Sequence, residues 1–273
     1  MPASADRDLW YVYGIVSPDM PRGRLPAGLD DAAVVIEPEG NVAALVSKLD
    51  ADEYDASSLE TNSGSVEWLS PRAVAHDRVL TWASDQGPVI PLPMFSIFSG
   101  ASALHEMLRG RRAQLLETLG RVRRGREYAL RVYRVDSELF AAVPSLSPRL
   151  AEMAHSAAAA SPGQRYLLER KLEAEQRAEM RSVSQRLVDD IVGALSRHAV
   201  EVVRSPIPRG DADVAGSGTM VLNGAFLVEA SSLPALQQTL TALVAAHQTH
   251  GLRFDFTGPW PPYHFVAEHA HAD

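Results

Sequence analysis

The pattern of apolar positions near the start of the chain predicts three strands. Residues 9–16, LWYVYGIV, are β-branched and aromatic and are followed by turn residues, which is typical of a strand. Residues 32–50 predict two short strands around the turn residues Pro38, Gly40 and Asn41. The front of the chain therefore begins as a small sheet.

Helices follow, separated by one proline-interrupted segment. Acidic, serine-rich residues 50–68 predict a loop with at most a short helix, and Ser70 is expected to cap a helix over 71–84 that starts with proline. Residues 87–98 are apolar, but their two internal prolines cannot donate to a ladder, so an edge or irregular strand is expected. Four leucines and a valine, spaced four, seven, four and three positions apart, predict a helix over 101–122.

The second half has a clearer pattern. A strand is expected from residue 126. Ser161 then caps a long helix that reaches about Arg197. The apolar stripe of this helix comprises Leu168, Leu172, Met180, Val183, Leu187, Ile191 and Leu195. The segments that follow are a strand at 199–207, a polar loop at 208–218, an apolar and hence central strand at 219–230, a helix closed by Gly251, and an alternating strand at 252–257.

The order from residue 126 is thus strand, helix, strand, strand, helix, strand, which is the split βαβ order of a ferredoxin-like domain. We predict an α+β protein with two serial domains. Residues 1–124 form a smaller α+β sandwich, residues 125–258 form a ferredoxin-like βαββαβ domain with a long first helix, and residues 259–273 form a proline- and aromatic-rich tail.

The composition of the chain limits its expected cellular location and partners. Its 273 residues contain no apolar run near the roughly 20 residues that span a bilayer, so no membrane partner is expected. The absence of cysteine excludes disulfides and thiolate metal sites and fits a reducing cytoplasm, and the N-terminal residues lack the pattern of a secretory signal. A net charge of −8 argues weakly against nucleic acid as a partner. We expect a cytoplasmic protein.

The charges are unevenly distributed. Residues 28–60 carry nine acidic residues against one lysine, whereas residues 109–126 carry seven arginines against one glutamate. The basic stretch is either a set of solvated helix faces and a basic loop or a docking surface for an acidic partner. In the second interpretation the candidate partner-binding residues are Arg109, Arg111, Arg112, Arg121, Arg123 and Arg124.

The segment FTGPWPPYHFV, residues 256–266, combines rigidity with aromatic surface. Gly258 is expected to end the last strand, because the prolines that follow oppose its continuation. Trp260, Tyr263 and Phe265 offer large apolar surfaces. We interpret them first as a structural latch against the other domain; a platform for a partner and an active-site wall are the alternatives.

No catalytic, cofactor or metal site is predicted. The chain lacks a glycine-rich phosphate loop with its lysine and lacks a nucleophile elbow. His247 and His250 lie three apart on a helix without a neighbouring carboxylate, so they are expected to be solvated or half-buried, and His76 is expected to serve packing or hydrogen bonding. His264, His269 and His271 with Glu268 are expected in a disordered tail.

Four stretches together resemble the gas vesicle protein F/L family (GvpF/GvpL). They are LWYVYGIV, SPGQRYLLERK, TMVLNGAFLV and FTGPWPPYHFV, in the family's order over nearly the whole chain. The resemblance implies a two-domain α+β accessory protein of gas vesicle formation, located at the gas vesicle, with no catalytic site. At 91–98 the chain departs from the family's Pro-x-Arg-Phe-Gly-like run, since Met94, Phe95 and Ser96 stand there.

The resemblance also implies partners. These are the small hydrophobic gas vesicle shell protein (GvpA-type) and other gas vesicle accessory proteins. We hypothesise that the shell protein binds a sheet surface in the N-terminal half, assisted by the arginines of 109–126. The rival hypotheses are a ligand-sensing or regulatory ferredoxin-like binding module, and an enzyme with a non-standard site.

Overall fold

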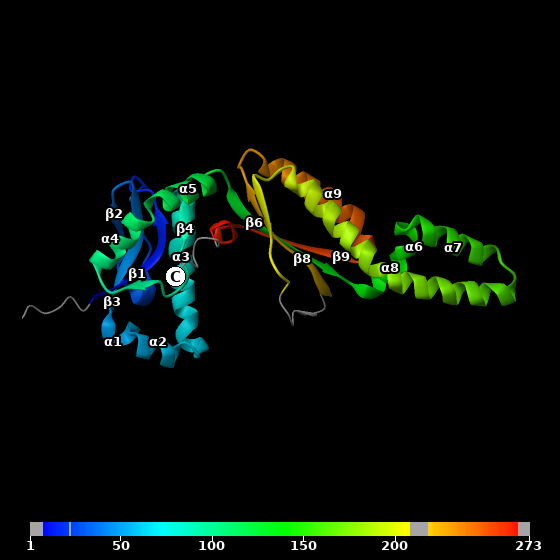
Figure 1. The fold of residues 1–273 in the computed structure, drawn as a ribbon, viewed down its shortest axis with the longest axis horizontal. Coiled ribbons are helices and arrows are strands. Elements are labelled where there is room, and N and C mark those ends of the chain that lie inside the picture. The colour runs from blue at the N-terminus through cyan, green and yellow to red at the C-terminus, as the bar shows by residue number, and fades with distance from the viewer. Residues whose placement is uncertain (1–7, 22, 208–217, 267–273) are drawn as a thin grey trace, which may run out of the picture. The chain divides into compact units, whose positions relative to one another are not determined.

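The computed structural model describes residues 8–21, 23–207 and 218–266. It is a mixed α+β protein with two antiparallel sheets (Figure 1). The described residues up to Glu127, together with those from Trp260 onward, form one compact unit, here called unit 1; Tyr128–Pro259 form the second, unit 2.

The sheet of unit 1 has its longest strands at its centre. The strand order is β2-β3-β1-β4, with β5 also paired to β1, and each pair is antiparallel. The three strands predicted from the β-branched and aromatic residues of 9–16 and from the turn residues within 32–50 are present. The segment 87–98 is irregular, as predicted, because it contributes only two very short strands and one of them forms an edge. The strands are β1 Asp8–Val16, β2 Val35–Glu39, β3 Val42–Asp50, β4 Val89–Pro91 and β5 Ile97–Phe98.

Residues 50–68 are mostly helical, so the predicted loop is wrong. The side chains of Asp50 and Asp55 accept hydrogen bonds from backbone N–H groups two and three residues later, which caps two short helices. A tertiary contact then holds the first of them: buried Arg72 donates to the Tyr54 hydroxyl at 2.7 Å and to Asp30 at 2.9 Å. The helices are α1 Ala51–Tyr54 and α2 Ala56–Asn62, and Asp30 lies in the 3₁₀ helix η1 Leu29–Asp31.

The next helix, α3 Val66–Gln86, starts earlier than predicted. Ser65 is its N-cap and accepts from the Trp68 N–H, whereas Pro71 lies inside the helix. A proline removes only one ladder bond there, and the packing of the buried face outweighs that loss. The predicted helix 101–122 is divided at Arg111, whose φ of −103° and ψ of 10° are non-helical, into α4 Ala101–Gly110 and α5 Arg112–Val122.

The sheet of unit 2 has the order β7-β8-β6-β9. The 219–230 strand is internal, as its apolar sequence predicted, and the loop predicted at 208–218 lies almost wholly outside the described residues. The last strand continues beyond Gly258 through Pro259, which corrects its predicted end; β9 is an edge strand, where a residue without an N–H is tolerated. The strands are β6 Arg126–Arg134, β7 Glu201–Arg204, β8 Thr219–Val228 and β9 Leu252–Trp260.

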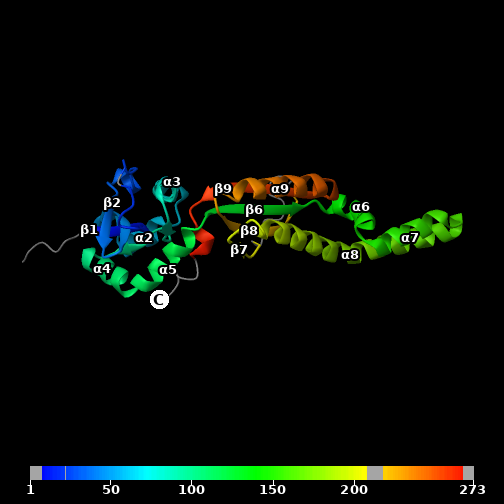
Figure 2. The ribbon, with the colours of Figure 1, turned by 90° about the horizontal axis from the view of Figure 1, so that it is seen from above.

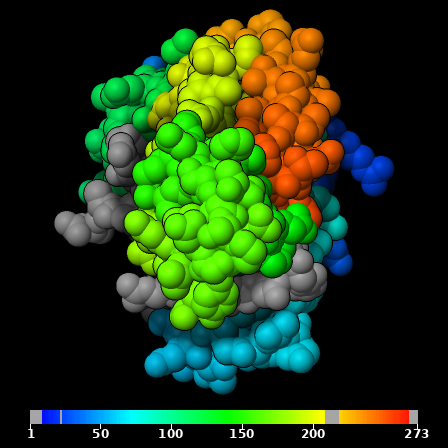
Figure 3. All heavy atoms as spheres, turned by 90° about the vertical axis from the view of Figure 1, so that its right-hand side faces the viewer, coloured from blue at the N-terminus to red at the C-terminus, as the bar shows by residue number. Residues whose placement is uncertain are grey.

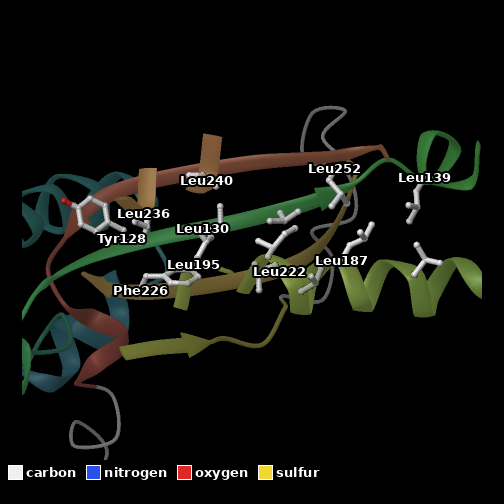
Figure 4. Packing of buried hydrophobic residues seen from close by; sticks show 14 of the residues in the cluster. Tyr128, Leu130, Leu139, Leu187, Leu195, Leu222, Phe226, Leu236, Leu240 and Leu252 are labelled. Carbon is white, nitrogen blue, oxygen red and sulfur yellow. The ribbon is translucent and has the colours of Figure 1, made fainter. Parts of the chain in front are cut away.

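The long helix and the last helix were predicted correctly as α8 Pro162–Ser196 and α9 Leu233–His247. Two helices were not predicted, α6 Asp136–Leu146 and α7 Pro148–Ala159, and they stand between the first strand and the long helix. Side chains of α8 and α9 pack with those of the sheet strands into one core (Figure 4). Its labelled members include Leu130, Leu187, Leu195, Phe226, Leu236 and Leu252.

Only the second half of α8 is buried against this core. Val183, Leu187, Ile191 and Leu195 are buried, whereas Leu168 and Leu172 of the predicted stripe are only partly covered. The first half of α8 runs beside α7, and the two project beyond the end of the sheet (Figures 1 and 2). In Figure 3 this α7/α8 hairpin, in green, lies nearest the viewer.

Candidate binding site on unit 1

A cavity of about 340 Å³ lies between the β4–β5 segment and the α4–α5 helices of unit 1. One wall is apolar and comes mainly from residues 90–98. The opposite wall comes from α4, α5 and the residue that joins them, and Val266 of the C-terminal segment also lines the space. Elements distant in sequence therefore meet around one concave site, which is the usual geometry for binding a ligand or a partner's side chain.

The β4–β5 wall is fastened to the central strand by hydrogen bonds. Leu92 N–H donates to the Tyr13 carbonyl at 3.0 Å, and Val12 N–H donates to the Ser96 carbonyl at 2.8 Å. Between them Phe95 has a φ of 65°, the left-handed region that non-glycine residues seldom adopt. Its N–H donates to the Tyr11 hydroxyl at 3.4 Å, and its ring stacks on Trp68. The surrounding contacts thus hold a strained turn in the cavity wall.

A buried histidine supports the same wall from behind. His76 on α3 is 6% exposed; its Nδ1 lies 2.6 Å from the Tyr11 hydroxyl, and the ring also bonds the Leu92 backbone. Burial lowers the pKa of His76 to about 4, although the Leu92 bond and Asp77 oppose this change, and burial raises the pKa of Tyr11. At neutral pH both groups are therefore uncharged, and the Tyr11 hydroxyl donates a hydrogen bond to Nδ1 of the neutral imidazole. His76 has the hydrogen-bonding role expected from the sequence.

The six candidate arginines do not share one surface. Arg109, Arg123 and Arg124 are exposed. Arg111 lines the cavity. The remaining two make contacts within unit 1: Arg112 lies 3.4 Å from Glu39, and Arg121 donates to the Phe265 carbonyl. The predicted role of these six arginines in binding a partner stays a prediction.

The C-terminal segment packs into unit 1. Phe265 is 2% exposed, and the Tyr263 hydroxyl donates to Asp77 at 3.1 Å. Trp260, by contrast, is 41% exposed. The segment contains the 3₁₀ helix η3 Tyr263–Phe265.

His264 in this segment was expected in a disordered tail, and that expectation is wrong. Its N–H donates to Glu127 at 3.0 Å, and its Nδ1 lies 2.6 Å from the other carboxylate oxygen. Glu127 is 1% exposed. The sequence did not indicate this pair, because Glu127 lies on the polar parity of β6, opposite Tyr128, Leu130 and Val132. His269, His271 and Glu268 lie outside the described residues.

His247 and His250, which were expected to be solvated or half-buried, lie at the end of α9 and in the 3₁₀ helix η2 Gln248–His250 that follows it. His247 and His250 lie with their Nδ1 atoms 3.5 Å apart and are partly buried, and burial lowers the pKa of His247. Within residues 8–21, 23–207 and 218–266, no group of three or more His, Asp or Glu residues could hold a metal ion. Among the helices described, none has the length and apolarity required to cross a membrane.

The fold defines a mixed α+β protein with two antiparallel sheets and covering helices. Comparison with known protein families finds a match over nearly the whole chain. The model of the family "Gas vesicle synthesis protein GvpL/GvpF" matches residues 9–267. The chain belongs to this GvpL/GvpF family.

Relatives and solved structures agree with this assignment. Gas vesicle protein L of Streptomyces sp. (strain CB03234) is 28% identical, covering 96% of this chain and 94% of the relative. Gas vesicle protein L2 of Halobacterium salinarum is 26% identical, and the match covers 94% of this chain and 91% of the relative. In fold, the crystal structure of GvpF from Anabaena sp. PCC7120 has a TM-score of 0.69 at 19% identity, covering 95% and 98%. That of GvpF from Microcystis aeruginosa has a TM-score of 0.65 at 20% identity, covering 95% and 99%.

Family membership supports a role in gas vesicle formation and an involvement with gas vesicle proteins. The family is a gas vesicle protein family and is not known for catalysis.

Proposed function

We propose that this protein is an accessory factor of gas vesicle assembly that binds the hydrophobic shell protein and other accessory proteins in the cytoplasm as the vesicle forms. The observation that carries the proposal is the family match over residues 9–267. In this role the protein needs no catalytic site, because its task is to associate with a partner.

The physical reason for such a factor is the apolarity of its partner. A shell subunit that faces gas exposes a large apolar surface before assembly, and such surfaces aggregate. A soluble protein that covers this surface, or presents it in order, prevents aggregation. Recognition by a sheet edge supplies main-chain hydrogen bonds in addition to side-chain pockets.

We place the shell-protein contact on unit 1, at the β4 edge and the nearby arginines. Two observations support this placement: β4 is a three-residue edge strand beside a concave site, and Arg109, Arg123 and Arg124 are exposed. Exposed guanidinium groups are suited to steering and pairing with carboxylates on a partner.

We further propose that the two units are the two domains expected from the sequence and that unit 2 is ferredoxin-like. The order β7-β8-β6-β9 and the helices α8 and α9 support this, with α6 and α7 as an insertion after the first strand. Trp260, Tyr263 and Phe265 are proposed to act as the latch, and the burial of Phe265 together with the Tyr263–Asp77 hydrogen bond supports this role.

A pull-down of purified shell protein by the full-length chain tests the proposed function. We expect capture by the unchanged chain and reduced capture after Arg109, Arg123 and Arg124 are all changed to Gln. A matched control changes the exposed α8 residues Arg170, Arg181 and Arg186 to Gln and should bind normally. Absence of capture by the unchanged chain would contradict the function, whereas equal loss in both variants would contradict only the placement on unit 1.

The alternative function, a ligand-sensing module, has one observation in its favour, the cavity of unit 1. A cavity of about 340 Å³ lies toward the small end of the roughly 300–1,000 Å³ typical of ligand pockets.

A further inference from the structure

The first half of α8 carries an exposed stripe that is both basic and apolar, here called the basic stripe. Its members recur at intervals of three, four and seven, so they lie on one side of the helix, opposite the partly buried Leu168 and Leu172. Tyr166 and Leu167 are 60% and 67% exposed. No Asp or Glu between residues 166 and 181 shares this side. The stripe comprises Tyr166, Leu167, Arg170, Lys171, Ala174 and Arg181, all of which are exposed.

The positive charges of the basic stripe have no carboxylate partner within the described part of the chain. Arg170, Lys171 and Arg181 form no ion pair there, whereas the flanking Arg177 pairs with Glu173. The stripe lies on the α7/α8 hairpin, which projects beyond the sheet of unit 2 (Figures 1 and 2). A positive surface that also exposes a tyrosine and a leucine is suited to a partner surface that is acidic and partly apolar.

An acidic surface with its own apolar residue lies on unit 1. Residues 49–71, which include α1, α2 and the start of α3, contain no lysine or arginine. Val66 in this segment is 67% exposed. The segment therefore offers the opposite charge to the basic stripe, together with an apolar contact point. The exposed acidic residues that define this acidic surface are Asp52, Asp55, Glu60 and Glu67.

We propose that the basic stripe of one copy docks on the acidic surface of a second copy of this chain. Opposite charges favour this pairing, whereas contacts between two stripes or between two acidic surfaces bring like charges together. Tyr166 and Leu167 of one copy then cover Val66 of the other, which removes exposed apolar surface from water. Because two different surfaces meet, the contact is heterologous: reciprocal contacts close a dimer, and successive contacts build longer assemblies. This inference stands independently of binding to the shell protein.

Sedimentation velocity of the full-length protein over a range of concentrations tests the proposal. At low salt, the average mass should equal that of one chain at about 1 µM and should exceed it at about 100 µM. Raising the salt to about 0.5 M should return the mass to that of one chain, because salt screens exposed charges from one another. The mass of one chain at every concentration, or association that salt does not weaken, would overturn the proposal.

Charge reversal identifies the two surfaces. One variant combines Arg170→Glu with Lys171→Glu and reverses the stripe. The other combines Asp52→Lys with Glu60→Lys and reverses the acidic surface. Each variant alone should need a concentration about tenfold higher to associate, because like charges then face each other. A mixture of the two should associate again, since the intact stripe of one variant meets the intact acidic surface of the other.

The matched control combines Arg109→Glu with Arg124→Glu. It changes the net charge as the stripe variant does, but at exposed positions of unit 1 that belong to neither surface. It should associate as the unchanged protein does, and circular dichroism checks that every variant is folded. An equal loss in this control would show that net charge alone governs association. Failure of the mixture to associate would refute the pairing of the two surfaces.

Discussion

At the scale of single residues, unit 1 depends on polar groups placed within an apolar core. His76, Tyr11 and Tyr13 are all buried, and each has a hydrogen-bond partner: His76 bonds Tyr11 and the Leu92 backbone, while Tyr13 bonds Ser47 and the Leu29 N–H. Buried polar groups are stabilising only when they are satisfied in this way, and their partners then specify one arrangement of the strands.

His76 should make the stability of the protein depend on pH. Its pKa is about 4 in the folded protein and about 6.5 when unfolded, so between these values the unfolded chain binds a proton that the folded chain does not. The contribution of neutral His76 to the free energy of unfolding is fully present above pH 6.5 and is lost as the pH falls to 4. We expect a loss of about 3 kcal/mol in the free energy of unfolding over this range, measured by urea denaturation at a series of pH values.

The variant His76→Gln isolates this effect, because glutamine can both donate and accept but does not titrate in this range. Its free energy of unfolding should fall less steeply between pH 6.5 and 4 than that of the unchanged protein. His155→Gln, at an exposed position on α7, should retain the original pH dependence. Identical slopes for His76→Gln and the unchanged protein would show that His76 is not the titrating group.

At the scale of elements, the hydrophobic pattern was reliable where apolar residues are either continuous or regularly spaced. It located β1, β3 and β8, which are buried along most of their length, and α8 and α9, whose buried residues recur at intervals of three and four. It failed where two local signals compete. Ser70 and Pro71 have the sequence of a helix start, yet Ser65 supplies the cap and tertiary packing tolerates the internal proline.

The same pattern did not show which part of α8 packs against the sheet. An apolar stripe has the same spacing of residues whether it contacts a sheet or another helix. In the structure the second half contributes to the main core, and the first half runs beside α7. Polar contacts fasten that hairpin: Arg149 pairs with Glu175 at 3.0 Å and with Glu179 at 2.9 Å. These pairs are exposed to water, so each is worth little.

Substitutions along α8 should therefore differ in cost by position. Ile191→Ala, at a fully buried site, should lower the free energy of unfolding by about 2–5 kcal/mol, because it leaves a cavity in the core. Leu167→Ala, where the side chain is 67% exposed, should change it by less than about 0.5 kcal/mol. Chemical denaturation monitored by circular dichroism measures both. A large loss for Leu167→Ala would indicate that the first half of α8 is buried in solution, for instance by a second copy.

At the scale of the whole molecule, the chain returns to unit 1 after completing unit 2. The segment that follows β9 contributes buried side chains to unit 1 and pairs His264 with Glu127 at the start of β6. The sequence predicted a rigid aromatic segment at residues 256–266. Its aromatic residues differ in burial: Phe265 is buried, whereas Trp260 is 41% exposed.

The proposed latch can be tested by comparing these two aromatic residues. Phe265→Ala should lower the free energy of unfolding of unit 1 by about 3–5 kcal/mol, since a fully buried ring is removed. Trp260→Ala should cost clearly less, because much of its ring already faces water. Hydrogen exchange of unit 1 amides, read by mass spectrometry, reports the loss. Unchanged exchange in Phe265→Ala would rule out the latch.

From the sequence alone follow the α+β class, most strands, the two long helices of the second half and the resemblance that led to the family. Local periodicity, capping residues and ordered motifs determine these features, and each of these signals involves only a few neighbouring positions. Tertiary contacts alone decide that Arg111 enters a cavity while Arg109 stays exposed, that Glu127 is buried against His264, and that α8 packs on the sheet with only half its length. Each of these arrangements depends on contacts between elements that are separated in sequence, such as Glu127 and His264, which lie 137 positions apart, and local patterns carry no information about such pairings.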